Sequence, residues 1–216
     1  MADPATDGLA TRWTRLWRQL GAPAVPDFAA LAASYGEAHR HYHTLEHIGE
    51  CLAAYDAQVV RDPAVELALW FHDAVYDPRR HDNEELSAAL FRTTALAAGG
   101  LDDALQGAVA DAILATRHRV VPADSRGRLV VDLDLGVLGA DRPRYERYEG
   151  DIRKEYAWVP WPDYARGRAA LMRAFLARTQ LYSTPALRAR WEAAARVNVA
   201  WTLERLATGP DSLTPS

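Results

Sequence analysis

The sequence is poor in cysteine, and this excludes several classes of protein. Cys51 is the only cysteine among 216 residues, so an internal disulfide is impossible and a zinc site built from thiolates is disfavoured. Cys51 lies within a helical apolar pattern, which is typical of a small core residue. The chain also lacks any apolar run close to the ~20 residues that a membrane-spanning helix needs. We therefore expect a soluble protein.

Clustered basic charge is absent as well. The formal net charge is −4, whereas a broad nucleic-acid surface needs an excess of basic side chains on one face. We therefore expect neither a nucleic-acid polymer nor a membrane as partner. Lys154 is the only lysine among the 25 Lys and Arg residues, so 24 are arginine, a side chain that suits bidentate phosphate recognition. Residues 1–8 have neither the basic start nor the apolar stretch of a secretory signal, which predicts a cytoplasmic protein.

Apolar residues recur at spacings of three and four along nearly the whole chain, which predicts an all-α fold. Asp62 and Thr184 each precede a proline at an expected helix start, and Asp163 is a third expected N-cap. Gly99 with Gly100 marks the end of a helix. Helices are expected at 9–20, 26–36, 44–60, 63–75, 82–98, 102–117, 129–139, 142–157, 164–182 and 185–207.

The segment 129–139, "LVVDLDLGVLG", permits a second interpretation, because its alternating apolar residues also fit a strand. Its helical neighbours favour a helix. The composition of residues 117–128 indicates the one long loop. No linker interrupts the helices, so we expect a single domain over 9–207 between disordered segments at 1–8 and 208–216.

Some polar residues fall on apolar helix faces, where burial without a partner costs several kcal/mol. His72 and Asp73 end the apolar stripe of "VELALWFHD". Asp134 has valine or leucine at the four neighbouring positions of its face, whereas Asp132 has a less apolar set. The pattern therefore predicts that Asp134 is the more inward of these two carboxylates.

Three of the seven histidines crowd into "RHYHTLEHI", residues 40–48. His43 and His47 are four residues apart, a spacing that stacks two side chains on one helix face. A zinc metalloprotease would need glutamate directly after the first histidine, and Thr44 occupies that position. Histidine and carboxylate together suit divalent manganese, iron, cobalt, nickel or zinc, and magnesium is a further candidate cofactor.

Four short motifs follow one another along the chain: "YHTLEHI", "ALWFHDAVYDP", "ILATRH" and "DLDLGVLG". Their order resembles the HD superfamily of metal-dependent phosphohydrolases, in particular the uncharacterised bacterial branch described as predicted HD phosphohydrolases. The similarity runs from about residue 35 to about residue 200 and includes "DNEELSA", "IRKEYAWVP" and "GRAALMRAFLARTQLY". It implies a helical bundle of the HD type.

The resemblance implies that His47, His72, Asp73 and Asp134 bind a divalent ion, with Asp132 as the alternative last ligand. By similarity to cyclic-nucleotide phosphodiesterases, His43 would be the general acid, although the roles of His43 and His47 could be exchanged. His43 and Asp73 are thus the candidate catalytic residues. Candidate substrate contacts are Arg40, Glu84, His118, Arg153 and Arg168, of which His118 lies where some relatives hold a second metal.

Metal-activated water would then attack a small phosphate ester, such as a nucleotide or related phosphorylated metabolite, in a phosphomonoesterase or phosphodiesterase reaction. Two other hypotheses stay open. Some HD-fold proteins are di-iron oxygenases, but these need additional histidines, and few follow Asp73. The chain could also be a non-catalytic helical module that binds a metal or another ligand.

Overall fold

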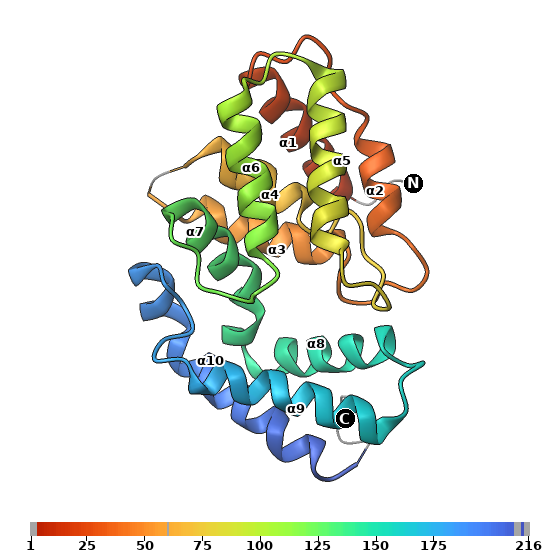
Figure 1. Cartoon of the computed structure of the whole chain (residues 1–216), viewed down its shortest axis with the longest axis vertical. Coiled ribbons are helices and arrows are strands. Elements are labelled where there is room, and N and C mark those ends of the chain that lie inside the picture. The colour runs from red at the N-terminus through yellow and green to blue at the C-terminus, as the bar shows by residue number, and fades with distance from the viewer. Residues whose placement is uncertain (1–3, 60, 210–212, 214–216) are drawn as a thin grey trace. The chain divides into compact units, whose positions relative to one another are not determined.

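The computed structural model describes residues 4–59, 61–209 and 213 of the chain. Within these residues the regular structure is helical and no strand occurs, which confirms the predicted all-α fold (Figure 1). The helices belong to two compact units, the first ending at Val131 and the second beginning at Asp132. The prediction of one domain over 9–207 stays a prediction. None of the described helices is both long and apolar enough to cross a membrane.

The first unit is built around α4. Helix α6 packs against α4 and α5, α3 packs against α4, and α1 packs against α2 (Figure 1). The helices are α1 (Pro4–Gln19), α2 (Phe28–Tyr35), α3 (Leu45–Asp56), α4 (Pro63–Phe71), α5 (Asn83–Ala98), α6 (Asp103–Ala115) and the beginning of α7 (Ser125–Asp134).

Aromatic residues hold α4 in place against α1. The Trp13 ring lies 5.4 Å from the rings of both Trp17 and Trp70 and 5.6 Å from that of Phe71, measured between centroids. The indole N–H of Trp13 donates to the carbonyl of Pro26 at 2.7 Å. Large aromatic side chains of this kind contribute most of the burial energy of a small core. This packing fixes the end of α4, from which the His72-Asp73 doublet follows.

The second unit contains the 3-10 helix η1 (Leu135–Gly139) and the helices α8 (Arg142–Glu155), α9 (Trp161–Ala177) and α10 (Pro185–Leu206). Helix α10 packs against η1 and α9. The contact with η1 depends on glycine, because a Cβ atom at Gly139 would lie 2.5 Å from the Cβ atom of Trp191. A Cβ atom at Gly136 would lie 3.0 Å from the same indole ring. Glycine at these two positions therefore lets α10 approach closely.

The predicted helix boundaries agree well with the structure at several capping residues. Asp62 caps α4, since its carboxylate accepts a hydrogen bond of 2.9 Å from the amide of Ala64. Gly99 ends α5 with a positive φ of 70°. The segment 129–139 is helical and not a strand, as α7 and then η1. The helix interpretation of this segment is therefore confirmed.

Other boundary predictions were wrong. Helix α1 begins at Pro4, so residues 4–8 are helical and not a disordered start, while 1–3 lie outside the described residues. Helix α7 begins at Ser125, so the expected loop is shorter than 117–128. Asp163 is not an N-cap, because α9 begins two residues earlier, after Pro160. Most of the C-terminal segment predicted to be disordered also lies outside the described residues.

The relative burial of Asp132 and Asp134 is the reverse of the prediction. Asp132 is 0% exposed, and its carboxylate accepts hydrogen bonds from the amides of Ser183 (2.9 Å) and Thr184 (2.5 Å). Thr184 occupies the N-cap of α10 and its side chain makes no capping bond, so Asp132 holds the backbone that leads into this helix. Burial raises the pKa of Asp132, which these bonds partly offset. Asp134 is only half-buried.

Candidate metal centre

The His72-Asp73 doublet lies where α4 stops. Asp62 and Pro63 start this helix, and seven of its nine residues are buried. His72 occupies the C-cap and is 1% exposed, while the side chain of Asp73 is 17% exposed. The apolar helix therefore carries two polar groups into the interior of the first unit, where they require partners.

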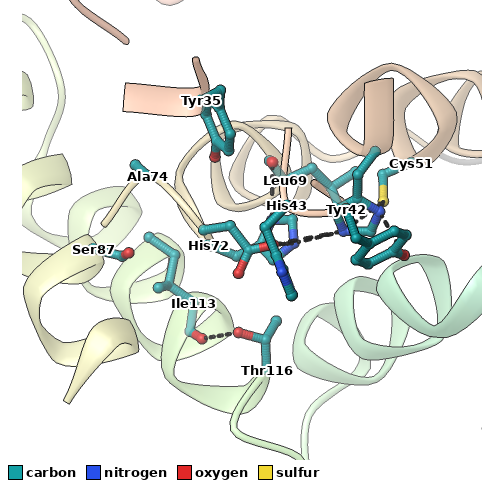
Figure 2. Close-up of polar contacts among 12 residues, drawn as sticks. Tyr35, Tyr42, His43, Cys51, Leu69, His72, Ala74, Ser87, Ile113 and Thr116 are labelled. Atoms are coloured by element: carbon teal, nitrogen blue, oxygen red, sulfur yellow. Dashed lines mark hydrogen bonds and ion pairs between the residues drawn. The ribbon is translucent and has the colours of Figure 1, made fainter. Parts of the chain in front are cut away.

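The first partner is His47, in the first turn of α3. Thr44 caps this helix by accepting a hydrogen bond from the amide of Glu46, and His47 is 2% exposed. The Nε2 atoms of His47 and His72 lie 3.2 Å apart. Asp73 Oδ2 lies 3.0 Å from His72 Nε2 and 3.6 Å from His47 Nε2. The polar contacts around His72 are drawn in Figure 2.

These three donor atoms are spaced as ligands of one ion would be. Ligands about 2.1 Å from a common ion lie about 3.0 Å apart at octahedral angles and about 3.4 Å apart at tetrahedral angles. The observed separations of 3.0, 3.2 and 3.6 Å cover this interval. His47, His72 and Asp73 could therefore hold a divalent metal ion.

The proton position on His72 fits the same role. Its Nδ1 atom lies 3.0 Å from the carbonyl oxygen of Leu69, which can only accept a hydrogen bond (Figure 2). The proton of the neutral ring is therefore assigned to Nδ1, and Nε2 presents a lone pair toward His47 and Asp73. A hydrogen bond to the second ring nitrogen is the usual way in which proteins orient a metal-binding histidine.

His47 is oriented in a similar way by Tyr42. The Tyr42 hydroxyl lies 2.9 Å from His47 Nδ1, and the two ring centroids are 4.7 Å apart. The Sγ atom of Cys51, one turn further along α3, lies 3.7 Å from the same nitrogen. The burial predicted for Cys51 is confirmed, because its residue is 2% exposed.

Removing the Tyr42 hydroxyl tests this arrangement. We expect Tyr42→Phe to weaken the binding of Co²⁺ or Zn²⁺ about tenfold, because His47 loses the bond that orients its ring. The aromatic packing is retained, so the thermal unfolding midpoint of the metal-free protein should change little. Competition with a chromophoric chelator measures the dissociation constant. Equal affinity in wild type and Tyr42→Phe would contradict the orienting role of Tyr42.

His43 lies beside this group and not on the same helix face as His47. It precedes the N-cap Thr44, so the prediction that the two histidines stack one turn apart on a helix was wrong. The His43 ring stacks on Tyr76, with centroids 3.9 Å apart and planes 25° apart. Its centroid is 6.3 Å from that of His47. The distances place His47 among the potential ligands and leave His43 as a separate group nearby.

Three further candidates of the first unit have different surroundings. Arg40 is buried, and its guanidinium donates hydrogen bonds to Glu37 and to backbone carbonyls. Glu84 is half-buried in the first turn of α5, three residues before the buried Ser87. His118 is half-buried and has a positive φ of 55°, a conformation that is uncommon for a residue other than glycine. Their roles toward a substrate stay predictions.

The remaining candidates belong to the second unit. Asp134 is the last residue of α7, and its role as the fourth ligand stays a prediction. Arg153 donates to the carbonyls of Tyr156 and Val159 near the end of α8. Arg168 forms a buried ion pair with Glu149, at 2.6 Å between Nη2 and Oε1. The structure thus gives both arginines protein partners, and phosphate binding by them stays a prediction.

Sequence reasoning did not identify Tyr42 or Tyr35 as part of this region. Tyr35 donates a hydrogen bond of 2.9 Å to the carbonyl of Trp70, and burial together with the Asp73 carboxylate raises its pKa well above the ordinary value. Tyr42 could have been suspected, because it stands inside the histidine-rich segment. Tyr35 carries no such signal, since it is the last residue of α2 and meets α4 only in the folded unit.

Comparison with known proteins identifies no relative of this chain. No family model matches the sequence, and no curated protein or solved structure is significantly similar to the chain. The resemblance to the HD superfamily therefore rests on the ordered motifs quoted above.

Proposed function

We propose that the protein is a metal-dependent hydrolase of a small phosphate ester. The observation that carries this proposal is the buried group of His47, His72 and Asp73, whose three donor atoms lie 3.0–3.6 Å apart. In octahedral coordination, three or four protein ligands leave positions for water and substrate, as a catalytic metal site requires. Asp134 is proposed as the fourth ligand on the strength of the sequence motifs.

A bound divalent ion would supply Lewis-acid polarisation of a phosphoryl oxygen and a lowered pKa for water. The residues of the chain then have separate tasks. His72 presents an Nε2 lone pair because its Nδ1 atom bonds the Leu69 carbonyl, and His47 directs its Nε2 atom to the same position while its Nδ1 atom bonds the Tyr42 hydroxyl. Asp73 adds negative charge beside both imidazoles. Such a set of two histidines and a carboxylate suits manganese, iron, cobalt, nickel or zinc.

His43 is proposed as the proton donor to the leaving oxygen. It is half-buried and lies next to the ligands without being one of the three. Histidine titrates near neutral pH, so its imidazolium can give up a proton as negative charge develops on the leaving group. The stack with Tyr76 restricts the orientation of the ring. A proton donor held in this way contributes to the reaction rate through its orientation as well as through its acidity.

A substrate screen tests the proposal directly. Metal-free protein is loaded separately with Mn²⁺, Fe²⁺, Co²⁺, Ni²⁺, Zn²⁺ or Mg²⁺ and incubated with phosphate monoesters, phosphodiesters and nucleotides. We expect phosphate or alcohol release with at least one ion, and a loss of at least ~100-fold in Asp73→Ala. Asp111→Ala, an exposed carboxylate on α6, is the matched control and should retain activity.

Three outcomes would overturn the hydrolase proposal. Equal hydrolysis by wild type and Asp73→Ala would show that another group or a contaminant acts. Iron bound at two equivalents per chain together with oxygen consumption would instead support a di-iron oxygenase. Absence of both metal binding and hydrolysis would leave a helical binding module as the explanation.

A further inference from the structure

Arg40 is the least exposed arginine side chain of this region. It lies in the segment between α2 and α3, and its side chain is 0% exposed. Its guanidinium carbon lies 5.2 Å from the ring centroid of Tyr35 and 5.5 Å from that of Tyr76. Burial of a guanidinium between two aromatic rings is costly unless its N–H groups are satisfied.

Protein oxygens satisfy those N–H groups. Nε donates to Glu37 at 2.9 Å, and Nη1 donates to the carbonyls of Asp73 at 2.6 Å and His43 at 3.3 Å. Nη2 donates to the carbonyl of Ala74 at 3.2 Å. These four contacts engage most of the five guanidinium N–H bonds. The arrangement favours a structural role for Arg40 over the phosphate contact expected from the sequence.

The carbonyls that Arg40 binds follow the end of α4. The last carbonyls of α4 itself have no partner within the helix, so other groups must supply donors to them as well. Here His72 binds the carbonyl of Leu69, Tyr35 that of Trp70, and Arg40 those of Asp73 and Ala74. A cation at this end also interacts favourably with the helix dipole.

The same guanidinium reaches the segment that leads into α3. Its bond to the His43 carbonyl joins this segment to the backbone of Asp73. His47 and the His72-Asp73 doublet come from two different helices, so their separation depends on contacts between these segments. Arg40 makes such a contact with a rigid, planar group that a lysine cannot reproduce.

We propose that Arg40 is a positioning residue of the metal centre, whose guanidinium joins the turn at His43 to the backbone of Asp73 and Ala74. Through these bonds it sets the separation of the His47 and Asp73 ligand atoms. The inference rests on the proposed metal-binding function but not on any particular substrate. Arg40 itself does not contact the ion.

The test compares Arg40→Met and Arg40→Lys with wild type, using Co²⁺ as the probe. We expect the dissociation constant to rise about 10- to 100-fold in Arg40→Met and by a smaller factor in Arg40→Lys, as for other residues that orient metal ligands. We also expect the visible absorption bands of bound Co²⁺ to change, because the ligand geometry relaxes. A merely stabilising residue would leave these bands unchanged.

Arg12→Met is the matched control. Arg12 is also largely buried, but it pairs with Asp56 and Glu66, away from the potential ligands in sequence. Its loss should lower the thermal midpoint without altering the Co²⁺ spectrum. If Arg40→Met does not fold, the Co²⁺ affinity and spectrum of Arg40→Lys are compared with those of wild type instead.

An unchanged Co²⁺ affinity and spectrum in a folded Arg40 variant would overturn the inference. Both quantities are measured without substrate. A wild-type protein that binds Co²⁺ but hydrolyses no phosphate ester would therefore contradict the hydrolase proposal alone.

Discussion

Asp73→Asn is expected to weaken divalent-ion binding more than any substitution outside the three proposed ligands. Structural zinc sites with four ligands bind with about 10–16 kcal/mol, so each ligand carries roughly 3 kcal/mol, or somewhat more than 100-fold in Kd. The substitution keeps the shape of the side chain but removes its charge. Asp73 Oδ2 lies 3.0 Å from Nε2 of His72 and 3.6 Å from Nε2 of His47, so its charge faces both imidazoles.

Titration with Co²⁺ and Zn²⁺ against a competing chelator measures this loss. Asp111→Asn, the same chemical change on the exposed face of α6, should bind both ions as wild type does. Circular dichroism of the metal-free proteins confirms that the helices are retained. If Asp73→Asn and Asp111→Asn bound either ion with equal affinity, the proposed centre would be refuted.

Removal of the Arg168 guanidinium is expected to produce the largest loss of stability. Arg168 Nη2 donates to Glu149 Oε1 at 2.6 Å, and the two side chains are 8% and 0% exposed. Arg168 also donates to the Tyr148 hydroxyl at 2.8 Å. Burial lowers the pKa of Arg168, but Glu149 more than compensates and raises it well above the ordinary value. Arg168→Met would leave the Glu149 carboxylate buried without its cation, at a cost of about 3–5 kcal/mol.

The double variant Arg168→Met/Glu149→Leu separates two costs. One is the loss of the ion pair, and the other is the burial of an unpaired charge. Replacing both partners by apolar groups should restore most of the stability, because no buried charge is then left uncompensated. Urea unfolding followed by circular dichroism measures both variants. Arg173→Met, on the exposed face of the same helix, should change the free energy of unfolding by less than ~0.5 kcal/mol. A similarly small effect of Arg168→Met would show that the ion pair does not stabilise the unit.

The local features of the fold could be predicted from the sequence because they depend on nearby residues. Asp62 before Pro63 predicted the start of α4, and Gly99 predicted the end of α5, since caps act within one helical turn. Prediction failed for Asp163 because Pro160 and Trp161 allow α9 to begin earlier. It also failed for α1, whose first residues form a helix in spite of their polar composition.

Partners from distant parts of the chain could not be predicted in the same way. The sequence predicted Arg168 as a substrate contact, whereas the structure pairs it with the buried carboxylate of Glu149. The comparison of Asp132 with Asp134 used only the residues of their own helix. It missed the amides of Ser183 and Thr184, about fifty residues away, which bind Asp132 and explain its complete burial.

The sequence by itself determined the helical class and most helix boundaries. It also identified the polar residues that would need hydrogen-bonding or charged partners in the protein interior. These properties follow from apolar periodicity and capping, which act over three or four residues. Only the tertiary structure decided that His47 meets His72 and Asp73, that Arg40 binds the backbone around the doublet, and that Asp132 binds the amides before α10. The physical reason is that these distances depend on how separate helices pack, and no spacing within a single helix specifies that packing.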